Sequence, residues 1–206
     1  MILKSISVGP MQVNCYILAC ASGKEAIIID PGAEVEKIKA VLEEYKLNPV
    51  MVINTHGHYD HIGCDDKFGV GVYVHIQDLA MLLDAQLNFS AAFSLAYTVK
   101  SEIRTLEDKQ DIKLDCLELE VMHLPGHTPG GIALLMKKPE VGIVFTGDTL
   151  FYSGVGRTDL PQGSRLQLEK SIRERLFVLP NQTKVYPGHG PETTIEAEKN
   201  NNPFVR

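Results

Sequence analysis

The sequence lacks the features that mark membrane, secreted and low-complexity proteins. No apolar run approaches the roughly 20 residues needed to cross a membrane. Residues 1–10 alternate polar and apolar side chains and lack the apolar core of a signal peptide. No low-complexity tract occurs among the 206 residues, of which 44% are hydrophobic and 22% charged. We therefore expect a globular, cytoplasmic protein with no membrane partner, folded as a single domain over residues 1–206.

Cysteine pairs and positive charge are also scarce. The four cysteines, Cys15, Cys20, Cys64 and Cys116, show no Cys-x-x-Cys spacing, so the sequence predicts reduced thiols with structural roles. This includes Cys64, although it lies only three residues after His61. The net charge of -6 argues against a nucleic-acid-binding surface. A small molecule is the expected partner, and the sequence makes no prediction of the oligomeric state.

Short apolar runs separated by turn residues predict a mixed α/β protein. We expect strands at 2–8, 13–18, 26–29, 50–53, 72–75, 112–114, 117–124, 132–136, 142–145 and 183–186. Helices are expected at 34–45, 77–83 and 164–177, and from about residue 192. Residues 84–101 are the least regular part. There the four-residue spacing of Phe89, Phe93 and Tyr97 fits either a packed helix or a loop that covers a pocket, and we favour the helix.

The segment from Thr55 to His61 carries four side chains that can bind a metal: His56, His58, Asp60 and His61. It follows the apolar run from Val50 to Ile53, which predicts a buried strand, so the motif begins where a strand ends. Because His56 and His58 are two residues apart, they point the same way in an extended segment. Asp60 and His61 require a turn, which Gly57 permits. The motif therefore predicts two ligand sets facing one cavity, for zinc, iron or manganese.

Three further candidates, His127, Asp148 and His189, also lie just past predicted strands. The resulting seven side chains are too many for one zinc ion, which takes about four ligands. They suit two metal ions about 3.5–4 Å apart, bridged by a carboxylate and a water. Asp148 is the natural bridge, because a carboxylate has two oxygens. Asp30 also ends a strand and could be a ligand, a turn residue or a partner that holds a ligand in place, and we favour the last role. His75 has no companion and is expected to be structural.

Such a centre predicts hydrolytic chemistry. A metal-bound water has a pKa near 7, so hydroxide is present at neutral pH and can attack an acyl or phosphoryl centre. The metals also stabilise the oxyanion that forms. Asp60 and Asp148 are the expected catalytic carboxylates.

Four ordered motifs resemble those of the metallo-β-lactamase superfamily, and of its glyoxalase II-like hydrolases in particular. They are Thr-His-Gly-His-Tyr-Asp-His at 55–61, Pro-Gly-His-Thr-Pro-Gly at 125–130, Thr-Gly-Asp-Thr-Leu-Phe at 146–151 and Tyr-Pro-Gly-His-Gly at 186–190. The resemblance covers nearly the whole chain. It implies a four-layer αβ/βα sandwich of two mixed sheets with helices outside and metals at one edge. It also implies that His56, His58 and His127 hold the first metal, that Asp60, His61 and His189 hold the second, and that Asp148 bridges them.

The resemblance also implies a substrate class. Gly154 to Arg157 is similar to the glyoxalase II loop whose basic residue holds a glutathione carboxylate, although Arg157 could instead form a surface salt bridge. The C-terminal helical domain of longer glyoxalase II enzymes does not follow the last motif. We therefore expect a thioesterase acting on S-D-lactoylglutathione or a similar hydroxyacyl thioester through a metal-bridging hydroxide, with two ions, zinc first. The alternatives are a persulfide dioxygenase with a single iron on His56, His127 and Asp148, and a metal-binding module without catalysis.

Diiron oxygen reductases and persulfide dioxygenases of the same superfamily differ at two positions. The former typically carry glutamate where this sequence has His58, and the latter end in His-Asp-Tyr where this sequence has Gly-His-Gly at 188–190. Both differences favour the hydrolase.

Overall fold

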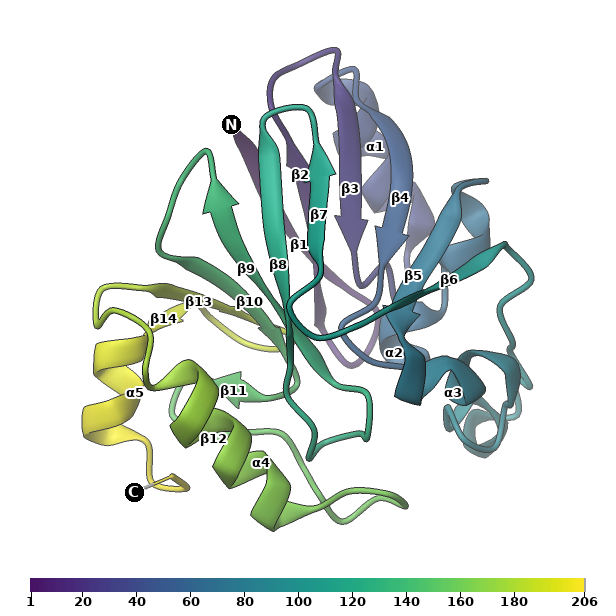
Figure 1. Cartoon of the computed structure of the whole chain (residues 1–206). Coiled ribbons are helices and arrows are strands. Elements are labelled where there is room, and N and C mark those ends of the chain that lie inside the picture. The colour runs from purple at the N-terminus through teal and green to yellow at the C-terminus, as the bar shows by residue number, and fades with distance from the viewer. Residues whose placement is uncertain (206) are drawn as a thin grey trace.

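A computed structural model describes residues 1–205, which form two mixed β-sheets packed face to face with helices on the outer sides (Figure 1). This confirms the four-layer αβ/βα sandwich expected from the sequence. No helix among the described residues is long and apolar enough to span a membrane.

The first sheet contains six strands in sequential order. They are β1 (Ile2–Val8), β2 (Val13–Ala19), β3 (Glu25–Ile29), β4 (Asn48–Ile53), β5 (Gly71–His75) and β6 (Ile103–Leu106). The first three pair antiparallel, and β3 to β6 pair parallel. The parallel strands end at the same edge, and the histidine motif follows β4 there.

The second sheet has the order β14-β13-β10-β9-β8-β7. Its strands are β7 (Asp111–Leu114), β8 (Leu117–His123), β9 (Ile132–Lys138), β10 (Ile143–Gly147), β13 (Lys184–Pro187) and β14 (Thr193–Thr194). Only β10 and β13 pair parallel, so both strands end at the same edge. A short ribbon, β11 (Leu150–Phe151) with β12 (Gly154–Val155), follows β10 at that edge.

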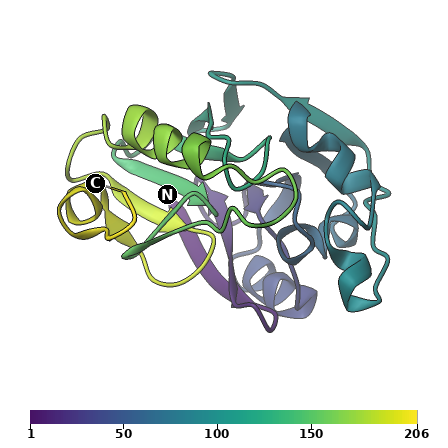
Figure 2. The ribbon, with the colours of Figure 1, turned by 90° about the horizontal axis from the view of Figure 1, so that it is seen from below.

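The helices cover the outer faces of the two sheets (Figure 2). On the first sheet lies α1 (Val35–Glu44), and on the second lie α4 (Arg165–Ser171), its π-helical continuation η4 (Ile172–Leu176) and α5 (Ile195–Asn201). Short helices fill the loops at the metal-motif edge: α2 (Tyr59–Ile62), η1 (Asp65–Lys67), η2 (Ile76–Asp78), α3 (Leu79–Leu83) and η3 (Ser90–Phe93).

Strand β2 shows how side-chain alternation builds the layers, because all seven of its residues are buried. Cys15 and Ile17 pack under α1 with Ile38, whereas Tyr16 and Leu18 pack between the two sheets. Successive side chains of a strand point to opposite faces. A strand that is apolar on both faces therefore belongs between two covered layers.

Residues 84–101 form a loop with one short helix, η3, so the expected packed helix is wrong. Phe89, Ser94 and Ala96 have positive φ values of 67°, 60° and 42°, which interrupt a helix. The buried Asn88 side chain holds the loop instead, donating to the carbonyls of Met81 (2.9 Å) and Tyr97 (3.0 Å). The edge strand β6 was also missed, because it is short and its middle residues are exposed and polar.

Cys20 and Cys116 form a disulfide, so the expectation of four reduced thiols is wrong for this pair. Cys20 follows β2 in the first sheet and Cys116 precedes β8 in the second, 96 positions further along the sequence. The remaining two, Cys15 and Cys64, are free and buried as expected. Disulfides are rare in reducing compartments, so the cysteine content no longer supports the expected cytoplasmic location.

Breaking this disulfide should destabilise the fold. The link closes a loop of about a hundred residues, for which chain entropy gives a stabilisation of roughly 4–5 kcal/mol at most. We expect Cys116→Ser to lower the free energy of unfolding by about 2–4 kcal/mol, measured by denaturant titration without reductant. Reductant should lower the stability of the unaltered protein to the level of the variant and leave the variant unchanged. Equal stability of the oxidised and reduced protein would contradict this expectation.

Candidate metal centre

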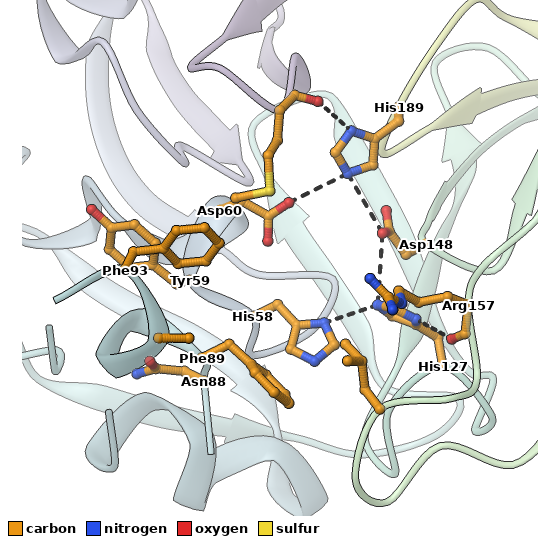
Figure 3. A pocket seen from close by; sticks show the side chains of 13 residues that line it. His58, Tyr59, Asp60, Asn88, Phe89, Phe93, His127, Asp148, Arg157 and His189 are labelled. Carbon is orange, nitrogen blue, oxygen red and sulfur yellow. Dashed lines mark hydrogen bonds and ion pairs between the residues drawn. The ribbon is translucent and has the colours of Figure 1, made fainter. Parts of the chain in front are cut away.

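The structure brings all seven predicted metal-binding side chains together at one edge of the sandwich. Figure 3 shows His58, Asp60, His127, Asp148 and His189 among them. The segment after β4, in the first sheet, supplies four of the seven: His56, His58, Asp60 and His61. The loops after β8, β10 and β13 supply one each from the second sheet. Three overlapping groups have ligand atoms within 4.8 Å of one another: His56 with His58 and His127, His56 with His61 and Asp148, and Asp60 with His61 and His189.

The first group consists of three buried imidazoles, those of His56, His58 and His127. His127 Nε2 lies 2.9 Å from His58 Nδ1 and 3.3 Å from His56 Nε2. Such distances suit hydrogen bonds only if one nitrogen of each pair carries a proton. For the pair of His56 and His127, the partners on the opposite side of the rings show that this is not the arrangement.

His127 Nδ1 donates to the backbone carbonyl of Arg157 at 2.7 Å. His56 Nδ1 lies 3.2 Å from the Thr55 hydroxyl, which itself donates to Asp30 Oδ2 at 2.6 Å and so accepts from the imidazole. In the neutral imidazoles the two Nε2 atoms are then unprotonated and face each other. Facing lone pairs repel, and a cation between them removes the repulsion. The residues therefore fit a metal ion, with His58 offering Nδ1 and the other two offering Nε2.

The second group combines Asp60 with His61 and His189. Asp60 Oδ2 lies 3.7 Å from His61 Nε2 and 3.4 Å from His189 Nε2. His61 donates its Nδ1 proton to Asp30 Oδ2 at 3.0 Å, and His189 donates its Nδ1 proton to the carbonyl of Met11 at 2.9 Å. Among the described residues, His61 Nε2 is buried without a hydrogen-bond partner. With both imidazoles neutral, this group also points unshared nitrogen electrons at one position.

Asp148 lies between the two groups. Its Oδ2 is 3.6 Å from His127 Nε2 and 3.5 Å from His189 Nε2, and its Oδ1 is 3.4 Å from His61 Nε2. Gly188 permits this approach, since a Cβ there would lie 2.2 Å from Asp148 Oδ1. One carboxylate thus contacts both groups, as the sequence predicted for a bridge.

The electrostatic environments of the two groups differ. Burial lowers the pKa of His56 well below its usual range, and burial together with His127 lowers the pKa of His58 to about 3. Burial would also lower the pKa of His61, but the carboxylates of Asp148, Asp60 and Asp30 raise it well above its usual range. His56 and His58 are therefore neutral imidazoles, whereas carboxylates stabilise the protonated form of His61.

Asp30 holds a ligand in place, as the sequence analysis favoured. Its carboxylate is buried and accepts the Thr55 backbone N–H at 2.7 Å, in addition to the Thr55 hydroxyl and His61 Nδ1. It thereby fixes the start of the histidine motif and the orientation of one ring. His75 is structural, as expected: it stacks on His123 with ring centroids 4.0 Å apart, and its Nδ1 accepts from Gln77 N.

Asp78 is a supporting residue that the sequence did not indicate. Its buried Oδ2 accepts from Gly57 N (3.0 Å) and from the Thr128 hydroxyl (2.7 Å), and its Oδ1 accepts from Gly130 N (2.6 Å). One carboxylate at the end of η2 thus connects the His56–His58 loop to the His127 loop. Glycine is required at 130, because a Cβ there would lie 2.5 Å from Asp78 N. The sequence did not indicate Asp78, because a single aspartate a few residues after a strand belongs to no recognisable motif.

A cavity of about 420 Å³ opens over the centre. Figure 3 shows Phe89, Phe93 and Tyr59 on one side of it and Arg157 on the other. Arg157 therefore lines the cavity, as predicted, but its guanidinium also forms a bidentate pair with Asp159, with both contacts at 2.8 Å. The salt bridge considered as the alternative is therefore present, and the substrate contact of Arg157 stays a prediction.

Removing the Asp78 carboxylate should loosen the first ligand group. Asp78→Ala leaves two backbone N–H groups without their acceptor, at about 1–3 kcal/mol each where they are buried. We expect metal affinity to fall about 10- to 100-fold, as is typical when support of a ligand is lost. The measurement is metal content after dialysis against graded metal buffers. Asp84→Ala is the matched control, because that carboxylate accepts only from Gln86 and Leu87 in an exposed turn. Unchanged affinity in Asp78→Ala would contradict the assigned role.

Comparison with known proteins agrees with this geometry. Among curated relatives, a probable metallo-hydrolase YqgX from Bacillus subtilis is 38% identical over 98% of this chain and 96% of its own. Hydroxyacylglutathione hydrolase GloC from Haemophilus influenzae is 36% identical over 98% of this chain and 97% of its own.

Solved structures agree as well. The B3 metallo-beta-lactamase BLEG-1 is 36% identical and superposes with a TM-score of 0.90 over 99% of both chains. TTHA1623, solved in a di-iron-bound form, is 37% identical with a TM-score of 0.82, over 98% of this chain and all of its own. A family model, the metallo-beta-lactamase superfamily, matches residues 8–189. The chain therefore belongs to the metallo-beta-lactamase superfamily of metal-dependent hydrolases.

Proposed function

We propose that the chain binds two divalent metal ions and hydrolyses a thioester. His56, His58 and His127 would hold the first ion, Asp60, His61 and His189 the second, and Asp148 would be shared. The observation that carries the proposal is the position of the Asp148 carboxylate, whose Oδ2 lies within 3.6 Å of an imidazole of each set. We propose zinc for both ions, with iron as the alternative that the di-iron relative supports.

The ions, when bound, supply Lewis acidity and lower the pKa of a water towards 7. The protein supplies the negative charges, on Asp148 and Asp60, that would offset the positive charge of the ions. Burial would raise the pKa of Asp148, but the imidazoles of His61, His127 and His189 outweigh burial and lower it. The pKa of Asp60 is lowered in the same way, with His61 outweighing burial. Both carboxylates therefore stay ionised at neutral pH, and we propose them as the catalytic carboxylates.

Among substrates that a metal-dependent hydrolase could cleave, thioesters fit the residues of the cavity best. Adding water across the C–S bond gives a carboxylic acid and a thiol. Arg157, at one side of the cavity, could hold a carboxylate on the thiol, and GloC, 36% identical to this chain, is a hydroxyacylglutathione hydrolase. S-D-lactoylglutathione or a similar hydroxyacyl thioester is accordingly the first substrate to test.

The activity test is thiol release from S-D-lactoylglutathione under strictly anaerobic conditions, followed with a colorimetric thiol reagent. We expect free glutathione to appear without oxygen, and metal analysis to approach two ions per chain. Asp148→Ala should lower turnover at least about a hundredfold and reduce the metal content, because both ligand sets lose the shared carboxylate. Oxygen uptake with glutathione persulfide, together with no thioester cleavage, would overturn the proposal in favour of a persulfide dioxygenase.

Arg157→Ala tests the thiol side of the cavity. A charge-assisted hydrogen bond contributes about 1.5–3 kcal/mol, which corresponds to a loss of roughly 10- to 150-fold in kcat/KM. We expect the lower end of this range, because Asp159 already engages Nε and Nη2 of the guanidinium. KM should rise and kcat should change little, since the contact lies away from the reacting bond.

Two controls accompany this test. Metal content should be unchanged, because Arg157→Ala keeps the backbone carbonyl that holds His127. Asp159→Asn should lower KM for the same substrate by releasing the guanidinium from its partner. An equal loss in Arg157→Ala for a neutral thioester and for a carboxylate-bearing one would show that Arg157 supports the loop and not the substrate.

A further inference from the structure

A second cavity, of about 310 Å³, lies beside the first and is almost entirely apolar. Its lining includes the turn between β1 and β2, Gly32 and Ala33 after β3, and Phe93 and Leu95 of the 84–101 loop. Among the residues that line it, only Asp60 carries a charge. A pocket of this size and character suits a hydrocarbon group.

The two cavities adjoin each other next to the metal centre. Met11, Tyr59, Asp60 and Phe93 line both of them. Asp60 is also one of the seven predicted ligands, so the apolar cavity reaches the edge of the metal centre. Arg157 lines only the first cavity, and Figure 3 shows it across the metal centre from Phe93, which lines both cavities.

The walls of the apolar cavity are fixed by hydrogen bonds. The Met11 carbonyl accepts from His189 Nδ1 at 2.9 Å, which ties the β1–β2 turn to the metal centre. Gly9 N donates to Glu34 Oε2 at 2.8 Å on the other side of that turn. In the 84–101 loop, Ser90 and Tyr97 exchange hydrogen bonds through the Ser90 hydroxyl, at 2.9 Å and 3.1 Å. The cavity is therefore preformed, and a ligand would not have to order it.

The rim of the cavity exposes apolar surface that a ligand would cover. Met11, Phe93 and Leu95 are 41%, 55% and 53% exposed, respectively, and all three lie on the lining. Large apolar side chains gathered around a concave site mark a binding surface, whereas scattered ones are ordinary. Covering them would remove their remaining contact with water, which is favourable by the area buried.

We propose that this cavity binds the acyl group of the substrate. This acyl group is an aliphatic one of several carbons. The inference rests on the proposed thioester hydrolysis. A thioester has two arms that meet at the reacting carbonyl. With the carbonyl at the metal centre, a carboxylate-bearing thiol extends towards Arg157 and the acyl chain extends between Met11 and Phe93. The lactoyl group is too short to fill the cavity, so longer acyl thioesters are the preferred substrates.

The test is a series of acetyl, butanoyl and hexanoyl thioesters of glutathione. Each methylene moved from water into the cavity should raise kcat/KM about fourfold, which gives up to about 250-fold for the four methylenes between acetyl and hexanoyl. Leu95→Asp places a charge on the exposed rim and should lower the hexanoyl-to-acetyl ratio about tenfold. Leu166→Asp is the matched control, because Leu166 is an exposed leucine on α4 that lines neither cavity. It should leave both the ratio and the activity unchanged.

A binding measurement separates this inference from the proposed reaction. The affinity of the purified protein for acetate, butanoate, hexanoate and octanoate, measured by calorimetry, should increase with chain length, and Leu95→Asp should reduce the increase. An increase in affinity without any thioester cleavage would support the cavity assignment and overturn the thioesterase. Thioester cleavage with kcat/KM and carboxylate affinity both independent of chain length would overturn the cavity assignment and leave the thioesterase intact.

Discussion

Four imidazoles at the metal centre are held through the nitrogen that faces away from it, and the arrangement of the surrounding loops depends on this constraint. The acceptors are the Thr55 hydroxyl, the Asp30 carboxylate and the backbone carbonyls of Arg157 and Met11. Each acceptor fixes both the ring orientation and the protonated nitrogen. Because two of them are backbone carbonyls, the conformations of the β1–β2 turn and of the loop after β12 are parts of the site.

Much of this structure could be predicted from local sequence. The strands follow from short β-branched runs, and the ligands follow from histidines and aspartates placed just after those runs. The supporting groups could not be predicted in this way. Asp78 acts across two loops that are distant in sequence, and the Met11 carbonyl acts through the backbone, which leaves no trace in side-chain identity. The pairing of Cys20 with Cys116 likewise depends on the packing of one sheet on the other.

The loop at 84–101 shows why periodicity alone was misleading. Its aromatic side chains recur every four residues, as on one face of a helix, yet Phe89 and Phe93 line a cavity from a loop. Asn88 and Ser90 satisfy the backbone groups that a helix would have paired, so the segment needs no regular structure. The result is an aromatic wall whose position is set by polar contacts behind it.

The disulfide and the metal centre lie at opposite ends of the same pair of sheets. Cys20 follows β2, whose antiparallel partner β3 leads towards the metal edge, and Cys116 precedes β8, whose far end leads to His127. Ligands at the metal edge come from both sheets, so coordination joins the sheets there as the disulfide does at the other end. Metal binding to a site that exists only in the folded chain contributes to folding free energy. Chelation and reduction would therefore both act on the closure of the sandwich, and their combined effect on unfolding need not equal the sum of the two.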